Sequence, residues 1–155
     1  MNNFEQLLDS LDADQLLIEL DTQISELCAY GDALTKLTPA QQIFYFNQCF
    51  ERELNNGGFN QYFYNSSGNY AHETIAALTT IGANNMAGIL QKAIAAFPNA
   101  QVPTNWEQRQ DVVLEIEEEA NELWEALDQE FYAYPDNLVE LNYNYVLANK
   151  QQFSF

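Results

Sequence analysis

Residues 56–68 decide the fold, and they read Asn-Gly-Gly-Phe-Asn-Gln-Tyr-Phe-Tyr-Asn-Ser-Ser-Gly. The stretch holds four aromatic residues, three Asn and one Gln, and it carries no charge. Aromatic side chains belong in a core, whereas buried carboxamides must find hydrogen-bond partners. Gly57 and Gly58 can adopt backbone conformations that strain other residues, so we expect them to stop one helix and start another at a sharp angle.

We therefore predict that this stretch, the hub, is a structural corner of the protein. Its aromatic side chains should lie among the surrounding helices, and its carboxamides should bind free backbone groups. A ligand pocket or an active site at the hub is the alternative interpretation. The residues expected to build the hub are Asn56, Gly57, Gly58, Phe59, Gln61, Tyr62 and Asn65.

The same string resembles a family of bacterial DNA-mimic proteins, whose NGGF core follows a Phe- and Tyr-rich helix and precedes a Glu-rich helix. The resemblance covers roughly Pro39 to Lys150. It implies an all-helical, acidic, dimeric protein that occupies the DNA-binding surface of a helix-turn-helix repressor. The motif itself marks the fold rather than the activity.

The composition is that of a globular chain with a large negative charge. The 155 residues are 47% hydrophobic and 14% aromatic, which is enough for the core of one domain. Against 23 Asp and Glu stand only 5 Lys and Arg, so the formal net charge is -18. Such a charge repels nucleic acids and anionic membranes and attracts cationic partners. Direct binding to DNA, RNA or membranes is therefore not expected.

The cysteines and the N-terminal residues predict a cytoplasmic protein. Cys28 and Cys49 are too few and too far apart for a disulfide framework or a zinc cluster, and both have apolar neighbours. The first residues lack the basic start and apolar run of a signal peptide, and no apolar stretch has the length of a membrane span.

Apolar residues recur three or four positions apart along the chain, and no alternating strand pattern occurs. The sequence predicts a single compact all-α domain of about six to eight helices with an acidic surface. We divide it into an N-terminal acidic helical segment, residues 1–36, and a core, residues 39–155. Residues 71–97 are almost uncharged, which places them in the interior or at a subunit interface.

Several helix boundaries can be predicted from local signals. Thr38 to Gln41 is typical of a helix start with a capping box, and Thr104 to Glu107 is typical of a second one. Asn84 or Asn85 is expected to cap another helix. The last helix is predicted from Asn137 to about Phe153, with Leu138, Leu141, Tyr145 and Leu147 facing inward.

The helix after Thr104 separates apolar from acidic residues most clearly. At about 100° per residue, one face holds Val113, Ile116, Ala120, Leu123, Leu127, Phe131 and Tyr134. The opposite face holds six acids, which we name the acidic column: Glu107, Asp111, Glu115, Glu118, Glu122 and Glu125. At about 1.5 Å per residue the column is roughly 27 Å long. Only Arg109 is available to relieve its like-charge repulsion.

A second acidic group is predicted near the N-terminus. Asp12, Glu19 and Glu26 are spaced seven residues apart and can share one helical face. Glu5 and Asp9 would extend this stripe in a continuous helix, but a break near Asp9 and Ser10 would separate them.

The sequence lacks the parts of the common catalytic and metal sites. Its one histidine, His72, lies in an apolar segment, where a structural role is expected. No HExxH, CxxC, P-loop or GxGxxG motif occurs. Carboxylates alone can hydrolyse glycosides or bind metals, but an exposed row is a poor cage because divalent ions need converging ligands. We predict that the protein is not an enzyme and needs neither cofactor nor metal.

A row of carboxylates does match what a DNA-binding surface recognises. Lys and Arg side chains of such a surface are placed to meet regularly spaced phosphates. With the family resemblance, the acidic column favours a DNA mimic whose partner is a basic helix-turn-helix regulator. The alternatives are an immunity-type inhibitor of a basic toxin or nuclease, and an acidic structural protein.

Overall fold

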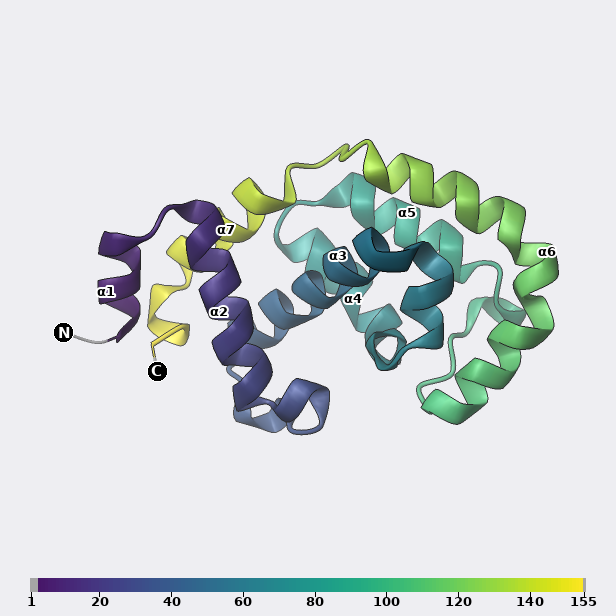
Figure 1. Cartoon of the computed structure of the whole chain (residues 1–155), viewed down its shortest axis with the longest axis horizontal. Coiled ribbons are helices and arrows are strands. Elements are labelled where there is room, and N and C mark those ends of the chain that lie inside the picture. Colours follow the sequence, from purple (N-terminus) through teal and green to yellow (C-terminus); the bar gives the residue numbers. More distant parts are fainter. Residues whose placement is uncertain (1–2, 155) are drawn as a thin grey trace. The chain divides into compact units, whose positions relative to one another are not determined.

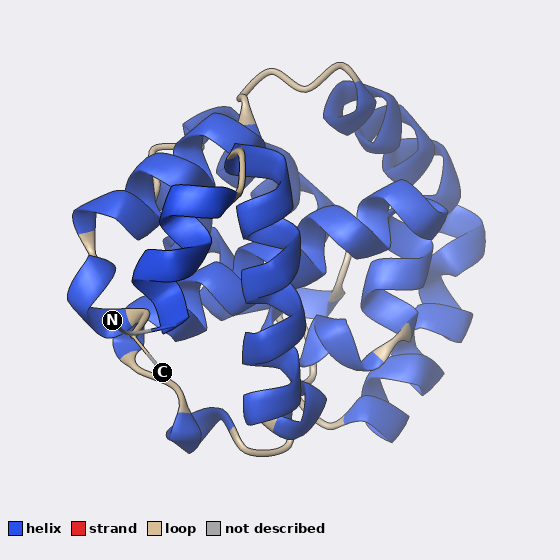
Figure 2. Ribbon diagram, turned by 60° about the vertical axis from the view of Figure 1, so that its left-hand side comes forward, coloured by secondary structure: helices blue, strands red, loops and turns tan. Residues whose placement is uncertain are grey.

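The computed structural model describes residues 3–154 and is all-helical, with no strand among them (Figures 1 and 2). This confirms the predicted fold class. Short 3-10 segments and turns join the helices. The seven α-helices are α1 (Asn3–Ser10), α2 (Ala13–Leu27), α3 (Pro39–Tyr64), α4 (Ala71–Thr80), α5 (Asn84–Ile94), α6 (Trp106–Tyr132) and α7 (Leu138–Ala148).

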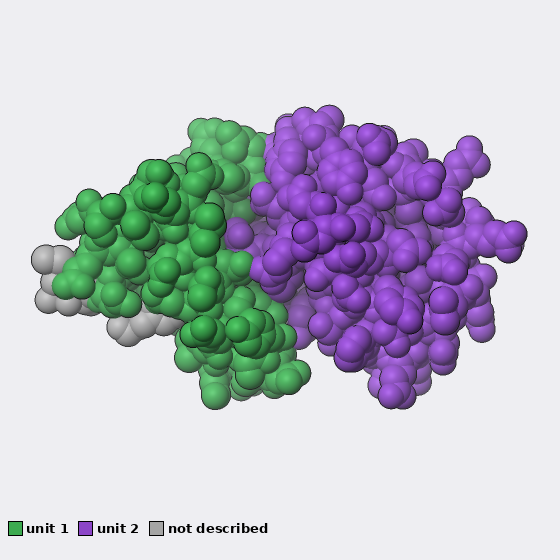
Figure 3. All heavy atoms as spheres, in the orientation of Figure 1, with its two compact units in different colours: residues 1–45, 137–155 green, residues 46–136 purple. Residues whose placement is uncertain are grey.

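The described residues form two compact units, coloured separately in Figure 3. One comprises the residues up to Tyr45 with those from Asn137 onward, so it contains α1, α2, the start of α3 and α7. The other comprises Phe46–Asp136 and contains the rest of α3 with α4, α5 and α6. The hub and the acidic column both belong to this second unit.

The first unit is built on α2 and α7, which pack against each other. α2 buries Leu16, Leu20 and Ile24. The ring of Phe153 lies 6.3 Å from that of Phe4 and 5.8 Å from that of Phe44, which ties both ends of the chain to α3. α7 ends at Ala148 rather than near Phe153.

The inward face of α7 also differs from the prediction. Asn142 and Val146 are buried with Leu138, whereas Leu141, Tyr145 and Leu147 are half-buried. The Nδ2 atom of Asn142 donates to the carbonyl of Leu138 at 2.9 Å, so one half of the carboxamide is satisfied by its own helix. The apolar spacing in the sequence does not identify Asn142 as buried, because its side chain is polar.

The predicted helix starts at Thr38 and Asn137 are confirmed, and at Asn137 the side-chain Oδ1 atom accepts the hydrogen bond from the Glu140 N–H at 3.1 Å. The Gln41 N–H donates to Thr38 Oγ1 at 3.2 Å, and the Thr38 N–H donates to Gln41 Oε1 at 2.9 Å. At α6 the cap is Asn105, not Thr104, because its Oδ1 atom accepts the hydrogen bond from the Gln108 N–H at 2.9 Å.

α5 is capped by a residue far away in the sequence. Neither Asn84 nor Asn85 caps it; both lie inside the helix, whose N-cap position is Ala83. The Oδ2 atom of Asp136 instead accepts a hydrogen bond from the Met86 N–H at 2.8 Å, and Oδ1 accepts one from the Asn85 side chain at 3.0 Å.

The hub interrupts α3 as predicted. The backbone leaves helical geometry at Gly57 (φ -167°) and Gly58 (φ 69°, ψ -166°), and the helix resumes at Phe59. Positive φ with extended ψ is open almost only to glycine. The aromatic side chains of Phe59, Tyr62 and Phe63 that follow are fully buried.

These aromatic side chains form the centre of the second unit. The Tyr62 and Phe131 rings both meet Phe50 edge-on, at 5.5 Å and 5.6 Å. The Phe63 ring lies 4.8 Å from Phe97 and 5.3 Å from Trp124. The hub therefore joins α3 to α6 and to the segment that follows α5 through one aromatic cluster. No helix within residues 3–154 has both the length and the hydrophobicity to cross a membrane.

Candidate functional site

The candidate site is the exposed face of α6, the long green helix of Figure 1. α6 is continuous from its cap at Asn105 to Tyr132. Ten of the 23 acidic residues of the chain lie on it, against one basic residue, Arg109. This is the densest concentration of negative charge in any of the described helices.

All six residues of the acidic column are exposed. The buried side chains of α6 are Arg109, Val113, Ala120, Trp124, Leu127 and Phe131. At about 100° per residue these lie opposite the column, so the column carboxylates point away from the core. The structure therefore places the six acids on one outward face of a single uninterrupted helix.

The apolar face of α6 differs from the prediction. Leu123 and Tyr134 are exposed, Ile116 is half-buried, and Trp124 is buried instead. The Trp124 indole N–H donates to the Ala93 carbonyl at 3.1 Å. The helix is therefore turned so that its largest side chain fills the space beside α5, which leaves Leu123 at the edge of the contact.

Arg109 does not relieve the repulsion within the acidic column, and that expectation is wrong. Its side chain is fully buried, and its guanidinium donates to backbone carbonyls of the hub. The distances are 2.7 Å to Phe63 and 2.8 Å to Asn65, with further bonds to Pro103 at 3.0 Å and Thr104 at 3.4 Å. Burial lowers the pKa of Arg109. Arg109 therefore anchors α6 to the hub and leaves the column uncompensated.

The carboxamides of the hub bind carboxylates rather than backbone groups, contrary to the prediction. Glu53 Oε2 accepts from the side chains of Gln61 at 2.9 Å and Asn65 at 3.0 Å. The Asn60 side chain donates to Glu117 at 3.4 Å, and Asn56 is exposed. Several backbone groups of the hub are instead bound by side chains of α6, among them two charged residues, Arg109 and Asp128, which sequence analysis did not assign to the hub.

Asp128 is the second of these charged residues. Its Oδ1 atom accepts a hydrogen bond from the Phe59 N–H at 2.8 Å. Partial burial raises the pKa of Asp128, the hydrogen bond from Phe59 lowers it, and the nearby charge of Glu125 raises it. The carboxylate faces Gly58, where a Cβ atom would overlap with it. The missing side chain at Gly58 thus makes room for the residue that caps the resumed helix.

His72 and the two cysteines are held within the fold rather than grouped into a site. The Nε2 atom of His72 accepts a hydrogen bond from the Val102 N–H at 3.0 Å. Cys28 and Cys49 are buried and not joined in a disulfide. Within residues 3–154, no three His, Cys, Asp or Glu side chains converge so that they could hold a metal ion.

The N-terminal acidic residues lie in the first unit. Asp12 is exposed and caps α2, with its Oδ1 atom accepting from the Gln15 N–H at 2.9 Å. Glu26 is exposed, while Glu19 is half-buried and accepts from the Gln23 side chain at 2.7 Å. The predicted break lies between α1 and α2, so Glu5 and Asp9 sit on a different helix.

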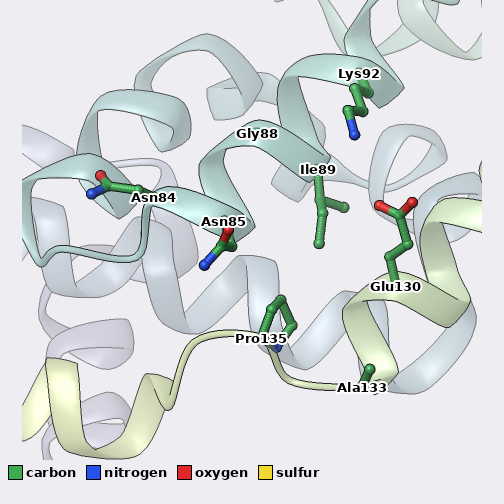
Figure 4. A pocket seen from close by; sticks show the side chains of 8 residues that line it. All are labelled: Asn84, Asn85, Gly88, Ile89, Lys92, Glu130, Ala133 and Pro135. Carbon is green, nitrogen blue, oxygen red and sulfur yellow. The ribbon is translucent and has the colours of Figure 1, made fainter.

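A hollow of about 400 Å³ lies beside the start of α5, and Figure 4 shows its lining. Lys92 of α5 and Glu130 of α6 line it, together with uncharged residues. With one charge of each sign, the hollow offers a cationic partner no net attraction. It is therefore chemically unlike the acidic column.

Comparison with known protein families identifies the chain. The DMP19-like protein family matches residues 35–149, which contain the hub and the whole acidic column. The chain belongs to this family. The match confirms the resemblance to a DNA-mimic family drawn from the NGGF string. It begins after Asp12, Glu19 and Glu26, so the second acidic group lies outside it. No curated protein and no solved structure matches the chain.

Proposed function

We propose that this chain is a DNA mimic that binds the DNA-binding surface of a helix-turn-helix transcriptional regulator and blocks its binding to operator DNA. The acidic column carries the proposal. Its six carboxylates are exposed on one helix, over a length of roughly 27 Å by helix geometry. Lys and Arg side chains that contact successive phosphates can contact these carboxylates instead.

The attachment of α6 supports this role, because a substitute for a stiff duplex should itself be rigid. Arg109 binds backbone groups near one end of the helix, Trp124 binds α5, and Asp128 binds the hub near the other end. A column held in place loses little conformational freedom when a partner binds. The carboxylates act together, since single exposed ion pairs contribute only about 0 to 1 kcal/mol.

The test begins with immobilised protein and extract of the native cell. A helix-turn-helix regulator captured in this way is then bound to its operator fragment and titrated with the soluble protein in a competition gel. We expect release of the operator, at lower protein concentration in low salt than in high salt. A captured regulator that keeps its operator at every protein concentration contradicts the proposal. Capture of a basic toxin or nuclease instead supports the immunity-type alternative.

A further inference from the structure

A shallow apolar groove runs along one edge of the acidic column. It has a volume of about 260 Å³ and is lined by Ile116, Ala120 and Leu123 of α6, Ala96 just after α5, and Glu119 at its rim. α5 and α6 pack against each other, and Figure 1 shows them side by side. Ala120 is its buried floor, while Leu123 is 40% exposed. Apolar surface is thus left uncovered beside a row of charges.

The charges around the groove determine what can occupy it. Glu119 lines it, and Glu115 and Glu122 are exposed on the adjoining face of the same helix. The one basic residue of α6, Arg109, is buried against the hub. An apolar side chain that enters the groove must therefore come from a surface rich in Lys and Arg, since a neutral or acidic surface would bury these carboxylates without compensation.

A helix that reads DNA has this composition. Its Lys and Arg side chains contact phosphates, while an apolar side chain on the adjacent stripe contacts the methyl group of thymine in the major groove. On α6 the column offers the anionic acceptors and the groove offers an apolar contact next to them. Both elements of the DNA surface, the phosphate row and the methyl group, have a counterpart on this one helix.

We infer that the groove formed by Ala96, Ile116, Ala120 and Leu123 binds the apolar side chain of a helix-turn-helix recognition helix that otherwise contacts a thymine methyl group. This inference rests on the proposed function and adds partner selection to it. The column attracts any basic surface, whereas the groove selects basic helices with an apolar residue at the right place. The two contributions differ in salt dependence, because apolar burial is not screened by ions.

The experiment uses two synthetic helical peptides as probes. Both carry the same Lys and Arg residues along one face, and they differ at two adjoining positions one turn apart, which are Leu in one peptide and Ser in the other. Affinities for the full-length protein are measured by fluorescence anisotropy over a series of salt concentrations. We expect the Leu peptide to bind roughly 5- to 10-fold more tightly, with the same salt slope as the Ser peptide.

Two variants of the protein locate the effect. In Leu123→Ser the preference for the Leu peptide should disappear while the salt slope stays unchanged. Leu114→Ser is the matched control, because Leu114 is 56% exposed on the same helix but does not line the groove. Its peptide preference should equal that of the wild type. Should Leu123→Ser fail to fold, Ala96→Leu fills the groove from the α5 side and should abolish the preference in the same way.

The outcomes separate this inference from the proposed function. Equal, salt-dependent binding of both peptides to the wild type contradicts the inferred role of the groove, but it agrees with attraction of basic helices by the acidic column. If Leu114→Ser and Leu123→Ser both lose the preference for the Leu peptide to the same extent, the inferred role of the groove is also contradicted. If neither peptide binds at low salt, the column does not attract basic helices, and the proposed function fails together with the inference.

Discussion

Asp128 of α6 caps the second half of α3, because its Oδ1 atom accepts the N–H of Phe59 at 2.8 Å. Phe59 is the first residue after the break at Gly58, so its N–H belongs to a new helix start and has no carbonyl of its own helix to bind. The carboxylate comes from 69 residues further along the chain. One contact thus joins the hub to the helix that carries the acidic column.

The first prediction concerns the charge of Asp128. The pKa of Asp128 is raised in the folded protein, so its carboxyl group binds a proton more tightly in the folded state than in the unfolded chain. Ionisation of Asp128 therefore lowers stability as the pH rises from the unfolded value of about 4 through the raised folded value. Asp128→Asn keeps an oxygen acceptor for Phe59 without the charge, so its stability relative to the wild type should rise over this window and level off above it.

Urea denaturation of both proteins from acidic to neutral pH measures this difference, and the other carboxylates largely cancel in the comparison. Asp128→Ala is the control, since it removes the acceptor as well as the charge. It should lose about 0.5 to 2 kcal/mol at neutral pH, as other lost helix caps do. If the difference in free energy of unfolding between wild type and Asp128→Asn is the same at every pH, ionisation of Asp128 does not destabilise the folded protein, and the prediction is wrong.

The second prediction compares two glycines. Gly58 has φ 69° and ψ -166°, and a Cβ atom there would overlap with the Asp128 carboxylate, so Gly58→Ala should lose about 2 kcal/mol or more of folding stability. Gly88 lies inside α5 with no atom within 4 Å of its Cβ position, so Gly88→Ala should gain about 0.5 to 1 kcal/mol. Urea denaturation measures both. Two changes of the same sign would contradict this account of the hub.

The third prediction concerns Arg109. Arg109→Met fits an apolar interior but removes the Arg109 donors from four carbonyls, of which that of Asn65 still accepts from the Gly68 N–H, so we expect a loss of about 3 to 5 kcal/mol. Arg109→Lys keeps the charge but lacks the planar fork that reaches several carbonyls at once, and its loss should be smaller yet clear. Thermal melts followed by circular dichroism rank the three proteins. Near-equal melting temperatures would mean that Arg109 does not hold the hub.

Features that depend on neighbours in the sequence could be predicted. The capping box at Thr38 and Gln41 spans three residues, so the sequence alone specifies it. The break at the paired glycines and the outward acidic column follow equally from local conformation and helical periodicity. The caps from Asp128 and Asp136 could not be predicted, because their acceptors come from residues 69 and 50 positions away from the helix starts.

The orientation of α6 was predicted only in part, for a related reason. A helical wheel places Leu123 and Trp124 100° apart, and either can define the edge of the buried face. The choice depends on the space beside α5, where the Trp124 indole reaches the Ala93 carbonyl. Arg109 was expected to relieve the repulsion of the acidic column, although it lies one turn before Val113 on the buried face of the helix. Its burial needs several carbonyls that only the folded hub brings together.

The fourth prediction is that the protein is a homodimer. Exposed positions on α4 and α5 are largely uncharged, among them Ala76, Thr79, Thr80, Asn84 and Gln91. A pair of acidic columns would also suit a dimeric regulator, whose two recognition surfaces lie about 34 Å apart. Light scattering at micromolar concentration should give twice the mass of the chain. Thr80→Lys should shift the mass toward that of one chain, whereas Glu140→Lys on α7 should not; a monomeric wild type contradicts the prediction.

The last prediction concerns the column itself. Replacing Glu115, Glu118 and Glu122 with Gln keeps helix propensity nearly constant and removes like-charge repulsion. The melting temperature should therefore not fall, while affinity for the captured regulator should, chiefly through slower association. Binding by the triple variant should also depend less steeply on salt, because fewer charges take part. Stopped-flow association at several salt concentrations measures both effects.

A second triple variant separates the column from net charge. Asp14→Asn, Glu73→Gln and Glu140→Gln neutralise three exposed acids on α2, α4 and α7, so the net charge changes by the same amount. If long-range attraction by the whole protein dominated, both triples would slow association equally. If the column occupies the sites of phosphates, only the α6 triple should fail to displace operator DNA in the competition gel. If the wild type and the α6 triple variant displace operator DNA equally well, the column does not bind the regulator and is only a solvated helix face.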